Sequence, residues 1–255
     1  KNNTSGSYNT VNGYESLQAN TTGQRSTASG FRSIYSNTTG SNNSAIGNVA
    51  LYSNTTGSQN TGAGSGALYS NTTGNNNAAF GFEALYATNA SGDSGDNTGF
   101  GAHALRYNST GTHNTSLGSS AGDVLTTGSN NVIIGSEADP SANSGTNQIV
   151  IGKGATGQAD NSVVLGNADV TAVYMAQDQG ATTYGATFKG STSLQTPLIE
   201  YTDGDDAITI ADGGAVTTSG NLSVGGSNNE LRFYEGSNYV GFEAPALSAD
   251  KIWVL

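Results

Sequence analysis

The sequence has no cysteine, three prolines and only eight lysine and arginine residues among 255 positions. Without cysteine, the fold cannot rely on disulfides. The basic residues are scattered singly, so the chain lacks a basic run that could neutralise nucleic-acid phosphates. No window approaches 18 consecutive apolar residues, so we expect no membrane span. These absences argue against nucleic-acid binding and against a membrane-spanning segment.

Charged and large apolar residues are scarce as well, with 11% of residues charged and 34% apolar. A compact domain of this length needs more apolar surface to offset the conformational entropy lost on folding. Two interpretations remain, a disordered polar tract or a repeat protein with a thin, stacked core. The abundant residues are Asn, Thr, Ser, Ala and 37 glycines. This composition is more typical of secreted or virion proteins than of cytosolic enzymes, and we expect an extracellular protein.

Glycine recurs with a period of 17 residues, interrupted once by a step of 20. The main series comprises Gly13, Gly30, Gly47, Gly64, Gly81, Gly101, Gly118, Gly135 and Gly152. A second series, seven residues ahead of most of these, comprises Gly6, Gly23, Gly40, Gly57, Gly74, Gly111, Gly128 and Gly145. The longer step contains the stretch ASGDSGDN, and the register is intact on both sides of it. An insertion of this kind indicates a solenoid.

Other residue types keep the same step and predict ladders along the stack. The expected core ladders are Ile46, Phe80, Ile134 and Ile151 just before the main glycine, and Leu51, Leu68 and Leu85 four residues after it. The asparagine ladder, four residues before the glycine, is Asn43, Asn60, Asn77, Asn97, Asn114 and Asn131. A tyrosine column next to the leucines is Tyr35, Tyr52, Tyr69 and Tyr86. The registered columns favour order over disorder.

A unit of 17 residues is too short for a helical hairpin repeat. Two short strands and two glycine turns would fill one coil of an all-β solenoid, or β-roll, over residues 1–170. Coils about 4.8 Å apart place identical side chains in ladders, and Asn ladders can pair amide to amide. The glycines would supply the positive φ angles of tight turns. The NTT stretches that begin at Asn20, Asn37, Asn54 and Asn71 would cap these turns.

The core expected from these columns is thin, because each coil offers two large apolar residues and one small one. We therefore expect the coils to bury a second face against other copies, most economically as a homotrimer. A dimer or a broader sheet assembly stays open. The tyrosine column would either pack between chains, with its hydroxyls at the wet edge, or form an aromatic stripe that stacks on sugars.

The arms SNNSAIG, SNNVIIG, TNQIVIG and DNSVVLG resemble the head repeat of trimeric autotransporter adhesins, in which such strands stack into a left-handed β-roll. The step from Gly152 to Gly166 has 14 residues, close to that family's unit. The 17-residue units with NTTG turns are similar to segments of bacteriophage tail-fibre proteins. The resemblance covers about residues 6–170. It implies a stacked trimeric β-structure without identifying a ligand.

After residue 170 the period disappears. We expect a connector over 171–190 and a β-rich shaft segment over 191–255, with strands at Ala207–Ile210 and Leu231–Tyr234. The stretch NYVGFEAPALSADKIWVL is similar to the shaft region of phage tail fibres. Because the sequence stops at Leu255 on an apolar strand, we expect more protein to follow.

The sequence predicts no catalytic residue and no cofactor. His103 and His113 lack ligand-type neighbours at metal-binding spacing. The acidic residues Asp203, Asp205 and Asp206 partly resemble a calcium loop, but the terminal bidentate Glu is missing. Glycan depolymerases cut with paired carboxylates, and no carboxylate pair recurs in the repeat.

These observations favour a homotrimeric tail-fibre or adhesin segment that presents receptor-binding or surface-binding faces without catalysis. Its partners would be its own copies and a cell-surface glycan or protein receptor. Weak contacts repeated on three chains would sum to firm attachment. Two other functions stay open, a self-assembling extracellular filament subunit and a glycan depolymerase.

Overall fold

The computed structural model describes residues 3–88, 95–171, 173, 230–235 and 238–243. The chain divides into two units, residues 1–182 and 183–255, which are treated separately. Every regular element in the described ranges is a β-strand, and these ranges contain no helix. The all-β prediction is therefore confirmed.

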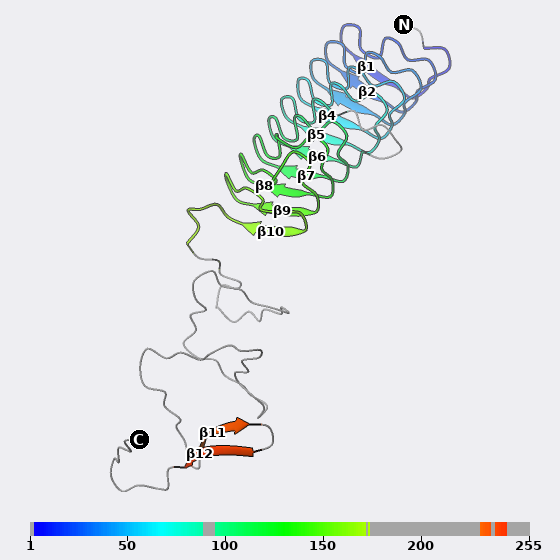
Figure 1. Ribbon diagram of the computed structural model, residues 1–255. Coiled ribbons are helices and arrows are strands. Elements are labelled where there is room, and N and C mark those ends of the chain that lie inside the picture. Colours follow the sequence, from blue (N-terminus) through cyan, green and yellow to red (C-terminus); the bar gives the residue numbers. More distant parts are fainter. Residues whose placement is uncertain (1–2, 89–94, 172, 174–229, 236–237, 244–255) are drawn as a thin grey trace. The chain divides into compact units, whose positions relative to one another are not determined.

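The first unit is a solenoid of parallel strands, each paired with its neighbours in sequence (Figure 1). The strands are β1 (Thr10–Asn12), β2 (Thr27–Ser29), β3 (Ser44–Ile46), β4 (Thr61–Ala63), β5 (Ala78–Phe80), β6 (Thr98–Phe100), β7 (Thr115–Leu117), β8 (Val132–Ile134), β9 (Gln148–Ile151) and β10 (Ser162–Leu165). Thr10 lies opposite Thr27, one 17-residue coil later. Ala78 lies opposite Thr98 across the insertion, so the insertion leaves the sheet register intact.

Each coil contains one strand of three or four residues, so the expectation of two strands per coil is wrong. The arm after the main glycine has positive φ at alternate residues, for example 52° at both Glu83 and Leu85. A strand requires extended φ and ψ, which this backbone does not have. The arm still bonds to the next coil, because Leu51 N–H donates to Ala67 O at 2.9 Å and Ser53 N–H to Tyr69 O at 3.0 Å.

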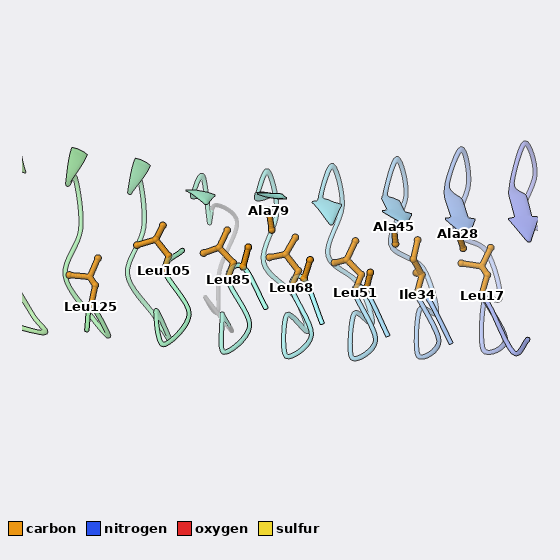
Figure 2. Packing of buried hydrophobic residues seen from close by; sticks show 13 residues of the cluster. Leu17, Ala28, Ile34, Ala45, Leu51, Leu68, Ala79, Leu85, Leu105 and Leu125 are labelled. Atoms are coloured by element: carbon orange, nitrogen blue, oxygen red, sulfur yellow. The ribbon is translucent and has the colours of Figure 1, made fainter. Parts of the chain in front are cut away.

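The interior is filled by the leucine column from one side and by the middle residue of each strand from the other (Figure 2). Leu51, Leu68 and Leu85 are fully buried, as the sequence predicted. The middle strand residues are small, and at Gly62 both the Ala67 carbonyl oxygen, 3.2 Å from an added Cβ, and a leucine side chain limit the space. A Cβ added to Gly62 in β4 would lie 3.6 Å from Leu51 Cγ.

The later coils fill the same interior with the opposite assignment of large and small residues. In β8 the middle residue is the fully buried Ile133. The leucine column there holds Gly122, where an added Cβ would lie 2.9 Å from Ile133 Cδ1. Interior volume is thus kept while large and small residues exchange sides, as close packing requires.

The predicted core position of Ile46, Phe80, Ile134 and Ile151 is wrong for the single chain. Ile46 is 54% exposed, and the other three are at least partly exposed. Successive strand residues point to opposite faces of the sheet, so a buried middle residue turns both of its neighbours outward. The apolar column before the glycine therefore lies on the outer face of the sheet.

The two glycine series differ in backbone conformation, although the sequence predicted positive φ for both. The main series has positive φ, such as 134° at Gly47 and 146° at Gly64. The second series has ordinary φ angles, and its constraint is close approach. A Cβ on Gly40 would collide with the carbonyl oxygen of Gly57 in the next coil. Glycine is needed there because adjacent turns stack backbone against backbone.

In the second unit, β11 (Glu230–Glu235) and β12 (Asn238–Glu243) form an antiparallel hairpin. The predicted strand at Leu231–Tyr234 lies within β11. The predicted strand at Ala207–Ile210 and the acidic cluster Asp203, Asp205 and Asp206 lie outside the described residues. So does most of the expected connector.

Candidate functional site

The outer face of the sheet carries a continuous apolar column, which we call the outer stripe. It is formed by Ile46, Phe80, Phe100, Leu117, Ile134, Ile151 and Leu165, the last residues of β3 and of β5–β10. Phe100 is 53% exposed, and Leu117 and Leu165 are exposed to a similar extent. Ala63 continues the stripe in β4. A large exposed apolar surface of this kind is typical of an interaction site.

The stripe widens toward the C-terminal coils. The first outward residue of each strand is polar at Thr27 and Thr61, and becomes apolar at Val132 and Ile149. In β10, Val163 is 59% exposed beside Leu165. None of the residues in β1–β10 is charged. The face is therefore suited to burial against another apolar surface and offers no acid, base or charged ligand group.

The tyrosine ladder, Tyr35, Tyr52, Tyr69 and Tyr86, lies on the arm after the main glycine, away from the strands. Its rings are parallel, with centroids 5.1, 5.2 and 4.9 Å apart and interplanar angles of 7° or less. The guanidinium of Arg32 lies 5.5 Å from the Tyr35 ring centroid. Neighbouring rings cover both faces of Tyr52 and Tyr69. A sugar would therefore meet ring edges and hydroxyls, not the open faces that stacking requires.

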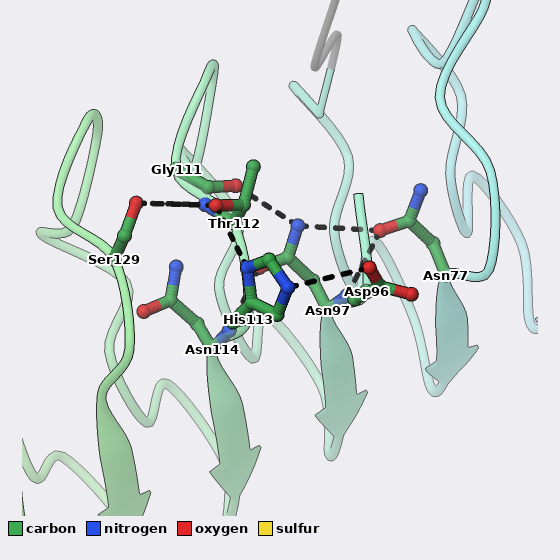
Figure 3. Close-up of polar contacts among 8 residues, drawn as sticks. All are labelled: Asn77, Asp96, Asn97, Gly111, Thr112, His113, Asn114 and Ser129. Carbon is green, nitrogen blue, oxygen red and sulfur yellow. Dashed lines mark hydrogen bonds and ion pairs between the residues drawn. The ribbon is translucent and has the colours of Figure 1, made fainter. Parts of the chain in front are cut away.

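The predicted asparagine ladder is buried and holds successive coils together. Asn43 Oδ1 accepts from the backbone N–H of Asn60 at 3.0 Å, and Asn43 Nδ2 donates to Gly57 O at 2.7 Å. Direct pairing of amides occurs at some rungs, such as Asn97 Nδ2 to Asn77 Oδ1 at 3.2 Å (Figure 3). These side chains satisfy buried backbone groups and are not available to a ligand.

The structure contains a second asparagine ladder, which the sequence analysis did not predict. Asn37 Nδ2 donates to Asn20 Oδ1 at 2.8 Å, and Asn54 Nδ2 donates to Asn37 Oδ1 at 2.8 Å. Each amide also reaches the carbonyl three residues ahead, as in Asn37 to Gly40 at 2.9 Å. The expected turn capping is therefore present. The 17-residue recurrence of NTT was the signal that could have predicted the ladder.

Ionisable groups form local pairs between coils. His113 Nε2 lies 3.4 Å from Asp96 Oδ2, and its Nδ1 lies 3.0 Å from Thr112 Oγ1 (Figure 3). Glu83 pairs with Arg106, and His103 Nε2 lies 3.6 Å from Glu83 Oε2. Within the described ranges, no three His, Cys, Asp or Glu side chains gather at metal-binding distance.

One carboxyl group stands apart from these pairs. Burial raises the pKa of Asp139 to about 6, with a further increase from nearby Asp123, while a hydrogen bond from the Val124 backbone acts in the opposite direction. Its buried Oδ1 has no hydrogen-bond partner. Asp139 occupies the column that holds leucines in earlier coils, so the polar group sits where the stack buries apolar atoms.

A depression beside β10 is lined by residues such as Thr156, Gln158, Val164 and Asn167, none of them ionisable. Across the described part of the chain, no helix is long and apolar enough to cross a membrane. Searches of protein-family models, curated proteins and solved structures found no match to this chain.

Proposed function

We propose that this chain is a segment of a homotrimeric extracellular fibre that extends and presents surface-binding faces without catalysis. The observation that carries the proposal is the outer stripe. It runs along the stack from β3 to β10, and its large side chains are open to solvent in the single chain. A soluble protein rarely leaves such a surface uncovered.

Copies aligned side by side along the solenoid axis would bury the stripe over its whole length. Neighbouring rungs are one sheet spacing apart, so identical coils of parallel copies meet at the same height. A closed arrangement around an axis covers every stripe, whereas an open arrangement leaves one exposed at each end. The resemblance to trimeric repeats supports three copies.

The remaining surface supports a role in attachment to a cell surface and not a role in catalysis. The turns repeat Asn, Thr and Ser at each coil, and three copies would multiply every weak contact with a cell-surface glycan or protein. The composition, rich in uncharged polar residues, supports an extracellular location. No step of the proposal requires a cofactor.

The Asp123 and Asp139 pair favours one alternative, a glycan depolymerase, because a carboxyl with a raised pKa can act as a general acid. Hydrolysis of bacterial surface polysaccharide by the full chain, lost in Asp139→Asn, would establish that alternative. The fibre proposal predicts no hydrolysis by either protein.

Cysteine cross-linking tests the arrangement, because the chain has no cysteine of its own. Phe100→Cys and Leu117→Cys place a thiol on the outer stripe, and Thr56→Cys places one on an exposed turn as the matched control. With a short trifunctional maleimide, the stripe variants are expected to give a band of three joined chains on a denaturing gel. The Thr56 variant is expected to stay a single chain. Single chains from both stripe variants, with native circular dichroism, would contradict the proposal.

A further inference from the structure

We propose that the tyrosine ladder is a site of oxidative modification, at which a one-electron oxidant links neighbouring coils of one chain through dityrosine. The oxidant would be hydrogen peroxide acting through a haem peroxidase. The inference does not rest on the proposed fibre function, because it concerns contacts within a single chain.

The geometry places equivalent phenols in register. The rings of Tyr52 and Tyr69 are inclined by only 4°, with centroids 5.2 Å apart. For parallel rings in matching coils, the two carbons ortho to the hydroxyls are separated by about the same distance as the centroids. The four tyrosines are half-buried, so their bodies are held by the stack while their outer edges reach solvent. Because the new bond lies in the planes of both rings, coupling requires the two outer edges to rotate from the stacked arrangement until the ortho carbons meet edge to edge.

The chemistry balances with one peroxide per link. Two neighbouring tyrosines each lose the phenolic hydrogen atom to the oxidised peroxidase and become radicals. A carbon–carbon bond forms between the two ortho carbons, and the hydrogens on these carbons move to the phenoxyl oxygens, which restores both phenols. Two electrons and two protons have left the pair, and they convert one hydrogen peroxide to two waters.

The surroundings favour coupling within the ladder over competing reactions. The chain has no cysteine, and its single methionine and tryptophan, Met175 and Trp253, lie outside the repeat, so no readily oxidised side chain interrupts the column. Tyr14 has a phenylalanine, Phe31, as its stacking neighbour at 5.6 Å and therefore no phenol to couple with there. Each link would join two coils covalently, as a disulfide does in cysteine-containing proteins.

The sequence makes the product easy to identify. Tryptic cleavage after Arg32 and Arg106 releases peptide 33–106, which contains all four ladder tyrosines and no other tyrosine. After treatment of the full chain with horseradish peroxidase and hydrogen peroxide, denaturation and digestion, we expect peptide 33–106 to lose two hydrogens for each link. The same peptide should show dityrosine fluorescence that persists after reduction.

Two double variants with equal numbers of tyrosines provide the decisive comparison. Tyr35→Phe with Tyr52→Phe leaves Tyr69 and Tyr86 as adjacent rungs, 4.9 Å apart. Tyr52→Phe with Tyr86→Phe leaves Tyr35 and Tyr69, separated by a phenylalanine rung. Phenylalanine preserves the stacked rings, and equal melting temperatures will show that both variants fold.

We expect the peptide to lose two hydrogens in the adjacent variant and to keep its mass in the alternating variant. Equal loss in both variants, no loss in either, or products that join peptides of two chains would overturn the proposal.

Discussion

The side-chain amide of Asn71 donates a hydrogen bond to Oδ1 of Asn54 at 2.9 Å, yet the buried Oδ1 of Asn71 accepts none. The next residue in the column is Thr88, whose buried Oγ1 also lacks a partner. Asn108, one coil further, donates its amide to Gly111 O and not to the preceding rung, and its own Oδ1 is unpaired because the rung after it is Leu125. The ladder is thus interrupted at Thr88, where an amide would have bonded in both directions.

Thr88→Asn is expected to stabilise the solenoid by restoring this rung. The backbone at position 88 matches the other rungs, since Thr88 N–H donates to Leu85 O at 3.2 Å as Asn71 N–H does to Leu68 O. A new amide could donate to Asn71 Oδ1 and accept from Asn108 Nδ2, which would satisfy the orphaned oxygen of Asn71 and remove the unpaired hydroxyl of Thr88. We expect a gain of about 1–2 kcal/mol in the free energy of unfolding by urea titration. A loss of stability would contradict the ladder description.

Asn54→Ala is expected to have the opposite effect, because it removes one amide and leaves those of Asn37 and Asn71 each short of a partner. Unsatisfied buried polar groups cost about 1–3 kcal/mol each. Ser58→Ala, at a site that makes fewer buried contacts, serves as the control and is expected to change the urea midpoint much less.

Gly47, a member of the main series, and Gly154, which belongs to neither series, are expected to differ in their sensitivity to alanine. At Gly47, φ is 134° and an added Cβ would lie 2.6 Å from Gly64 O, so Gly47→Ala meets both backbone strain and a clash. We expect a loss of more than about 3 kcal/mol. Gly154 has φ of 60° and open space around the added Cβ, so Gly154→Ala should cost only about 1 kcal/mol. Thermal unfolding compares the two, and equal costs would contradict the close approach of backbones.

Asp139 predicts a pH dependence of stability. Its pKa of about 6 lies above the ordinary value of 3.8, so the folded state favours the protonated carboxyl. Stability should therefore fall as the pH rises from about 4 to about 6 and then level off. Asp139→Asn is expected to remove this slope and to stabilise the protein at pH 7 by about 1 kcal/mol, after allowance for solvent screening.

Asp160 provides a control of opposite sign. A hydrogen bond from the Thr146 backbone and a second from Gln148 lower its pKa. Its contribution to stability should be lost as the pH falls through that lowered pKa, not as the pH rises. Urea titrations at several pH values separate the two carboxyls, and an unchanged slope in Asp139→Asn would contradict the assignment.

The fold was predictable from the sequence because ladders require strict registration. The 17-residue step identified the solenoid, and the leucine column identified half of the interior. The other half was not predictable from apolarity, because the buried strand residues are small ones such as Ala45 and Gly62. We predicted that the larger Ile46 beside them lies in the core because it is apolar. The alternation of side chains along a three-residue strand instead turns Ile46 outward.

The same error concealed the candidate surface, because the apolar column that we predicted to lie in the core is the exposed outer stripe. Periodicity shows that a column exists but not which side of the backbone it occupies. The backbone conformation of the arm after the main glycine was also not predictable, because residue type does not indicate positive φ at residues such as Leu51 and Glu83. Non-glycine residues rarely adopt that conformation, and here the stacked coils impose it.

The most direct test of the fibre proposal is the mass of the intact chain in dilute solution, measured by light scattering. The fibre proposal predicts about three times the 25.7 kDa chain mass. It also predicts that Phe100→Ser with Leu117→Ser reduces this mass to one chain, whereas Val124→Ser, at an exposed apolar residue outside the strands, does not. A single-chain mass for the unaltered protein would contradict the homotrimer. An open-ended, growing species would identify a filament subunit instead.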